Sequence, residues 1–122
     1  MSDEGIHLLG NLPYCELPQY LNLCDVFCMP SKFEAYGLVF PEALTFGLPC
    51  IGRNAYEMPY FIEEGETGYL LKQENAEELA DLMDKTLSSK QLATNVCERR
   101  DFYLKEYSWD TVARRIYEVI GE

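Results

Sequence analysis

Residues 30–49 read PSKFEAYGLVFPEALTFGLP and stand between two short apolar runs, at 26–29 and 50–51. Short apolar runs of this kind are typical of buried parallel strands. Ligands on parallel sheets bind beyond the carboxyl ends of the strands. Two carboxylates, Glu34 and Glu42, lie in the stretch that follows the first run. They therefore fall where substrate chemistry is expected.

The rest of the chain alternates expected strands and helices. Strands are expected at 6–9, 25–29, 49–52 and 69–71, and helices at 17–24, 38–46, 58–64, 75–89, 90–107 and 111–120. Gly47 stands where a helix end needs a left-handed residue, and Asn75 with Glu78 has the spacing of a capping box. The apolar face of the 75–89 helix is expected to comprise Leu79, Leu82, Met83, Thr86 and Leu87. This alternation predicts a parallel α/β sheet.

Length and charge restrict the class of protein. A chain of 122 residues that is 48% hydrophobic and 25% charged is typical of one globular domain rather than a disordered segment. The net charge of −11 argues against nucleic acid or anionic lipid as a partner, because both are bound by clustered Lys and Arg. The same charge opposes an anionic nucleotide, so a nucleotide site would need local positive potential.

The cysteines and the N-terminus indicate a reducing compartment. The five cysteines include no Cys-x-x-Cys pair, and we expect Cys24, Cys28 and Cys50 to be small buried hydrophobes. Metal and redox roles are the weaker alternatives, and no metal site is assigned. Residues 1–4 are acidic or polar, unlike a signal peptide, and no apolar run reaches the roughly 20 residues that span a bilayer. We therefore expect a cytoplasmic protein.

The stretch at 30–49 resembles the donor-binding motif of the group 1 retaining glycosyltransferases, which have the GT-B fold. The family pattern stands here as Pro30-Ser31, Glu34, Glu42-Ala43, Gly47 and Pro49. The similarity continues through 65–71 and 76–80 and covers nearly the whole chain. It implies an incomplete Rossmann-like fold, in which residues 1–122 are the second half of a C-terminal donor-binding domain.

The resemblance also implies roles for individual residues. Glu34 would be the catalytic-site carboxylate that orients the transferred sugar, and Glu42 would accept hydrogen bonds from the ribose hydroxyls. The turn through Tyr36, Gly37, Leu38 and Val39 would bind the donor diphosphate through backbone amides at a helix N-terminus. The ordinary alternatives are two solvated acids and a plain turn.

Three further residues are candidates for the donor site. Leu12 and Pro13 follow the expected 6–9 strand, where family members often place the base, although a simple loop fits equally well. Arg53 ends the 49–52 strand and would pair with a phosphate or with Glu34. One departure concerns residues 56–60, which read YEMPY where the family usually carries Gly-Gly and then Pro-Glu. This departure leaves open the identity of the donor sugar and the geometry of the loop.

The implied reaction transfers a hexosyl unit from a nucleoside diphosphate sugar to an acceptor hydroxyl with retention, with no cofactor besides the donor. The family pattern also contains two earlier strands, a basic pair that binds the phosphates, and an N-terminal acceptor domain. None of these is recognisable here, so this chain alone is expected to be inactive. Two alternatives are an acidic α/β interaction module that retains a relic motif, and a related nucleotide-sugar enzyme such as an epimerase.

The resemblance also bears on assembly. In the strand order 3-2-1-4-5-6, residues 6–9 would be strand 3 and residues 26–29 strand 4, without the two strands between them. The 6–9 strand could dock beside 26–29 in a four-stranded monomer. Alternatively, two chains could pair across the open edge, and we expect this homodimer because an unpaired strand edge invites pairing.

Overall fold

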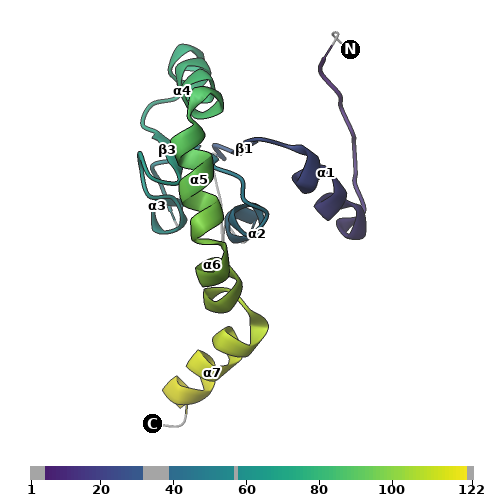
Figure 1. Ribbon diagram of the computed structural model, residues 1–122, viewed down its shortest axis with the longest axis vertical. Coiled ribbons are helices and arrows are strands. Elements are labelled where there is room, and N and C mark those ends of the chain that lie inside the picture. Colours follow the sequence, from purple (N-terminus) through teal and green to yellow (C-terminus); the bar gives the residue numbers. More distant parts are fainter. Residues whose placement is uncertain (1–4, 32–38, 57, 121–122) are drawn as a thin grey trace.

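A computed structural model describes residues 5–31, 39–56 and 58–120 of the chain (Figure 1). The elements in chain order are the 3-10 turn η1 (Tyr14–Glu16), α1 (Leu17–Leu23), β1 (Phe27–Cys28), α2 (Val39–Thr45), β2 (Cys50–Arg53), α3 (Met58–Phe61), β3 (Gly68–Leu71), α4 (Ala76–Ser88), α5 (Lys90–Glu98), α6 (Arg100–Glu106) and α7 (Trp109–Ile120). Helices α4, α5 and α6 follow one another as a column beside the sheet, and α7 continues beyond it (Figure 1).

The described strands form one parallel sheet in the order β1-β2-β3. Phe27 pairs with Cys50, and Cys50 pairs with Gly68. Gly68 is required by this pairing, because an added Cβ would lie 1.8 Å from the carbonyl oxygen of Cys50. The parallel sheet with flanking helices confirms the predicted α/β, Rossmann-like class. The order matches strands 4-5-6 of the predicted doubly wound sheet.

The core lies where α2 packs against β2, α3 and α6. Its fully buried side chains include Phe40, Ala43, Leu44, Cys50, Met58 and Val96. Phe40 also meets Phe27 of β1 edge to face, with ring centroids 5.7 Å apart. Helix α2 is therefore held to the sheet along its whole buried side, and this contact positions the segment that carries Glu42.

Helix α2 is terminated at Gly47, as predicted. Gly47 has a φ of +83°, and its N–H donates to the carbonyl of Leu44 at 2.9 Å. The N–H of Leu48 donates to the carbonyl of Ala43 at 3.1 Å. These two bonds form a Schellman motif, which needs a left-handed residue and so favours glycine. The motif returns the chain directly into β2.

The predicted cap of α4 is confirmed at Asn75, but the predicted capping box is wrong. The side-chain oxygen of Asn75 accepts hydrogen bonds from the backbone N–H groups of Glu77 at 2.8 Å and Glu78 at 3.4 Å. The Glu78 carboxylate accepts from the N–H of Lys72 at 3.0 Å instead of reaching back to the cap. It therefore fastens α4 to the end of β3.

The predicted helix at 90–107 is two helices that meet at Arg99. Arg99 has φ −92° and ψ 3°, outside the helical region. Its guanidinium contacts the carboxylates of Glu63 at 2.8 Å and Glu66 at 3.1 Å. Burial acts to lower the pKa of Arg99, but Glu63 and Tyr103 together raise it. The break thus coincides with a tertiary ion-pair network.

The prediction of a strand at 6–9 is wrong. These residues form no strand and are exposed, with Leu8 78% accessible. They belong to an extended segment that leads to α1 and lies away from the sheet (Figure 1). An apolar run becomes a strand only where a neighbouring strand satisfies its backbone, and in the described part of the chain none lies beside it. The four-stranded arrangement is therefore not found.

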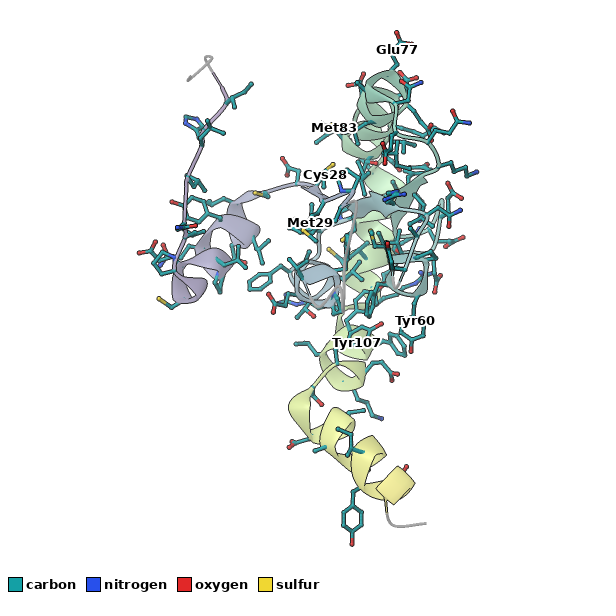
Figure 2. The ribbon with its side chains drawn as sticks, turned by 180° about the vertical axis from the view of Figure 1, so that it is seen from behind. Cys28, Met29, Tyr60, Glu77, Met83 and Tyr107 are labelled. Carbon is teal, nitrogen blue, oxygen red and sulfur yellow. The ribbon has the colours of Figure 1, made fainter. Side chains whose placement is uncertain are left out.

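Several predicted buried residues are more exposed than expected. On α4, Thr86 is buried and Leu79 and Leu82 are half-buried, but Met83 and Leu87 are 40% and 59% exposed. Among the cysteines, Cys50 is buried, Cys28 is half-buried and Cys24 is exposed. Figure 2 shows Cys28 of β1 and the adjacent Met29 at the flank of the molecule that faces the N-terminal segment. Cys28 and Met29 are partly buried, and Met29 packs against the core from this flank.

Candidate functional site

The candidate site is the edge at which the parallel strands end. Between β1 and α2 run residues 32–38, and they are outside the described part of the chain. The predicted site residues Glu34, Tyr36, Gly37 and Leu38 all fall within that range. Val39 begins α2 and is half-buried. The geometry of the site is therefore built from the residues on either side of this loop.

Glu42 lies in the first turn of α2 and is half-buried. In the same turn Phe40 is completely buried, and its Cζ would lie 3.2 Å from a Cβ placed on Gly52 of β2. This contact sets the first turn of α2 over the last residues of β2. A carboxylate is also favoured near a helix N-terminus on electrostatic grounds alone. Glu42 therefore lies in the helical turn whose Phe40 packs on Gly52, near the end of β2.

Arg53 is the last residue of β2, and its side chain is half-buried. Its backbone N–H donates to the sulfur of Met58 at 3.1 Å, and Met58 is fully buried. The next N–H, of Asn54, donates to the carbonyl of Leu71 at the end of β3, at 2.9 Å. These bonds join the end of β2 to α3 and to the end of β3, so the backbone of Arg53 lies at the edge where the parallel strands end.

The turn after Arg53 has an unusual backbone. The carbonyl of Ala55 accepts from the N–H of Met58 at 3.3 Å, which closes a four-residue turn with Tyr56 in its second position. Tyr56 has a φ of +55° and is the non-glycine residue with positive φ in the described part of the chain. Turns with positive φ at this position normally use Gly, Asn or Asp. A bulky residue there costs on the order of 1–3 kcal/mol.

The sequence indicated only in part that the turn at Tyr56 is unusual. The absence of the family's two glycines from residues 56–60 left the loop geometry open, and it did not indicate that Tyr56 itself would take a backbone conformation typical of glycine. Its side chain is 57% exposed at the strand ends. The left-handed conformation of Tyr56 is visible only in its backbone torsion angle φ, because no local sequence pattern predicts a left-handed tyrosine.

Leu12 and Pro13 lie outside the edge just described. They precede η1, Leu12 is half-buried and Pro13 is exposed. The Pro13 carbonyl accepts from the N–H of Glu16 at 2.9 Å, which closes the turn that starts α1. Because residues 6–9 form no strand, these two residues do not follow a strand end. Their contact with a base stays a prediction.

The thiols of the sheet are poor nucleophiles. Burial raises the pKa of the Cys50 thiol, and the neighbouring Cys28 acts in the same direction. Burial also raises the pKa of Cys28.

Within residues 5–31, 39–56 and 58–120, no cluster of three or more His, Cys, Asp or Glu side chains could hold a metal ion. The helices of this part of the chain include none that is long and apolar enough to cross a membrane.

Comparison with known proteins agrees with this architecture. The family described as Glycosyl transferases group 1 matches residues 2–103. The chain belongs to this family, as the motif at 30–49 predicted.

Three relatives show the range of proteins to which the chain is similar. It is 42% identical over 81 residues to an uncharacterized 41.2 kDa protein in the cps region of Klebsiella pneumoniae, covering 66% of this chain and 23% of that protein. It is 31% identical over 103 residues to the N-acetyl-alpha-D-glucosaminyl L-malate synthase of Bacillus anthracis, covering 84% and 27%. It is 27% identical over 125 residues to a GDP-mannose-dependent alpha-(1-6)-phosphatidylinositol monomannoside mannosyltransferase of Mycobacterium tuberculosis, covering 96% and 32%. The chain thus spans between 23% and 32% of these relatives.

Proposed function

We propose that this chain is part of the donor-binding domain of a retaining glycosyltransferase. The reaction would transfer a hexosyl unit from a nucleoside diphosphate sugar to an acceptor hydroxyl. The observation that supports the proposal most strongly is the position of Glu42, in the first turn of α2 and above the end of β2. Membership of the family and the sugar-transferring activities named for its relatives support the same reaction.

In this proposal, different residues at the edge of the sheet bind different parts of the donor. Glu42 accepts hydrogen bonds from the ribose hydroxyls, and a carboxylate suits that diol because it offers two acceptor oxygens. Glu34 orients the transferred sugar, and the backbone amides at Tyr36, Gly37, Leu38 and Val39 bind the diphosphate. Arg53 would add positive charge beside a phosphate, which offsets the net charge of −11.

The remaining requirements of the reaction would be met by other parts of a longer protein. Because the chain spans only 23–34% of the matched relatives, we propose that an acceptor-binding domain and the basic phosphate-binding residues lie outside it. The 122 residues alone would then bind a donor weakly and transfer nothing. We also propose a cytoplasmic location and, for the isolated chain, a homodimer through the open edge of β1.

Titration of the chain by NMR with UDP-glucose, GDP-mannose and free UDP tests donor binding directly. We expect chemical shift changes at residues 39–42 and 53–56. The Glu42→Ala variant should bind nucleotide more weakly by about 1–3 kcal/mol, the typical value of charged hydrogen bonds.

Glu77→Ala is the matched control, since Glu77 also lies in the first turn of a helix. Figure 2 shows it at the outer end of α4, away from α2. Equal affinities for Glu42→Ala and wild type would contradict the assigned role of Glu42. If none of these nucleotides binds, the donor site itself is wrong and an interaction module becomes the better interpretation.

A further inference from the structure

The outer edge of β1 presents backbone groups that the described sheet does not use. The N–H of Phe27 donates to the carbonyl of Pro49 at 3.0 Å, and the N–H of Met29 donates to the carbonyl at the next position but one of β2, at 2.9 Å. Because backbone groups alternate along a strand, the N–H and C=O of Cys28 point to the other side. In the described part of the chain β1 is an edge strand, so no strand pairs with Cys28 there. This half-buried residue therefore offers one donor and one acceptor to a further strand.

Helix α4 adds apolar side chains beside the same edge. Met83 is 40% exposed and Leu87 is 59% exposed. Figure 2 shows Met83 on the flank that also carries Cys28. Leu87 lines an open hollow together with Asp25 and Pro49, which lie just before β1 and β2. The unpaired edge and the exposed apolar side chains of α4 thus form one surface.

The sequence of this edge does not protect it from pairing. Natural edge strands are commonly blocked by charged side chains, by proline or by a bulge. Residues 26–29 read VFCM, with neither a charged residue nor a proline, and Pro30 follows only where the strand has ended. The extended segment that leads to α1 lies away from the sheet (Figure 1). The edge is therefore accessible to a strand from another chain.

We propose that this edge pairs with the same edge of a second copy of the chain, antiparallel and about a two-fold axis at Cys28. The inference deepens the homodimer of the proposed function by naming its contact surface, and it does not depend on donor binding. Two Cys28 residues that face each other satisfy both free groups, because each N–H donates to the other C=O. A second copy fits because the edge is complementary to itself, as a two-fold interface requires.

The side chains beside the edge are compatible with this pairing. Antiparallel pairing of two edges joins the two sheets into one and keeps α4 of both chains on the same face. Met83 and Leu87 of the two chains then lie on either side of the axis and can be removed from water together. In the register centred on Cys28, Asp25 lies opposite Ser31 of the second copy, so no like charges face each other along the strands.

Sedimentation equilibrium of the 122-residue chain over a concentration series tests the proposal. We expect a monomer–dimer equilibrium whose Kd rises at least about tenfold in Leu87→Glu, because the change adds a carboxylate to each side of the apolar contact. Ile116→Glu is the matched control, since Ile116 is 54% exposed on α7, and it should leave the Kd unchanged. Both positions are exposed, so the urea midpoints should stay at the wild-type value. A wild type that stays monomeric, or equal Kd values for Leu87→Glu and wild type, would overturn the proposal.

A cysteine cross-link tests the register. The chain is prepared with Cys15→Ser, Cys24→Ser and Cys97→Ser, which leaves Cys28 and the buried Cys50. Opposed residues of an antiparallel pair have Cα atoms about 4.5–5.5 Å apart, so a short bismaleimide should join the two Cys28 thiols. The reaction needs mildly alkaline pH, because burial raises the pKa of Cys28. We expect a covalent dimer that is lost when Cys28→Ser is added, and a dimer without this cross-link would show that the copies meet elsewhere.

Failure of this inference differs from failure of the donor site. The nucleotide titrations test the donor site by themselves, at residues 39–42 and 53–56. If nucleotides bind but the predicted dimer contact is not found, only this inference is refuted. If the dimer forms through Cys28 but no nucleotide binds, the donor site is refuted and the inference stands.

Discussion

Two regions of the molecule use the same kinds of apolar side chain differently. In the packed body, which we define as residues 25–31, 39–56 and 58–107, Phe40 and Leu44 are completely buried. In the N-terminal arm, residues 5–24, Leu8 and Leu23 are 78% and 82% exposed. Figure 1 shows the arm running to α1 beside the body rather than across it. Side-chain chemistry alone therefore does not explain which residues are buried.

The comparison of the body with the arm shows that an apolar side chain is buried only where another helix or strand packs against it. In the body, the apolar faces that are buried meet another element, as α2 meets β2 and α6. In the arm, Leu21 is 5% exposed and belongs to the core, while the leucine two positions later points away from it. Buried apolar area contributes roughly 25 cal/mol per Å², so an uncovered side chain contributes almost nothing to folding.

The largest expected effect contrasts one side chain from each region. Phe40→Ala should lower the free energy of unfolding by about 3–5 kcal/mol, because it removes a fully buried ring and its contact with Phe27. Leu8→Ala should change it by less than about 0.5 kcal/mol. Urea denaturation followed by circular dichroism measures both. A large loss for Leu8→Ala would show that the arm is covered in solution, for instance by a second chain.

The next effect tests the point at which the arm joins the body. Leu21→Ala should cost about 2–3 kcal/mol, because Leu21 is buried in the core. Leu23→Ala is the matched control, since it removes the same atoms from the same helix at an 82% exposed position. Equal stabilities of the two variants would mean that α1 is not docked on the body.

A smaller effect concerns the ion pairs of the body. Arg99→Ala should cost about 1 kcal/mol and cost less in high salt, because Arg99 joins two carboxylates at the break between α5 and α6. Lys72→Ala serves as the control: its pair with Glu64 is 3.8 Å long and mostly exposed, so no measurable change is expected. If the two variants lose the same stability at every salt concentration, the Arg99 network does not stabilise the break.

The smallest perturbation is chemical labelling of the native protein. Cys15 and Cys24 of the arm are exposed and should react rapidly with iodoacetamide near pH 8. Cys50 is buried, and its raised pKa keeps the thiol protonated, so it should react only after unfolding. Mass spectrometry of timed samples gives the rates. Rapid labelling of Cys50 would mean that the sheet opens readily.

Local patterns in the sequence predicted much of the body correctly. The end of α2 at Gly47 and the cap of α4 at Asn75 were predictable because each depends on contacts within one turn of the chain. The motif at 30–49 identified the family and placed Glu42 near the strand ends. The roles of all the site residues, Glu42 and Arg53 included, remain predictions.

The errors share one physical cause, which is dependence on distant residues. The 6–9 run and the 26–29 run are alike in sequence, but only the second lies beside β2 and can complete its hydrogen bonds. The break at Arg99 reflects carboxylates more than thirty residues away in the chain. Met83 and Leu87 follow the helical pattern of α4, but among the described residues they are 40% and 59% exposed.

By itself, the sequence determined the α/β alternation, the end of α2 at Gly47, the cap of α4 at Asn75 and the family of this protein, because these follow from short-range periodicity and motif spacing. The tertiary structure alone decided which apolar runs are buried and that α5 and α6 are separate helices. It also decided that Tyr56 occupies a left-handed turn at the site. The reason is that backbone strain and burial depend on neighbours that only the folded chain brings together.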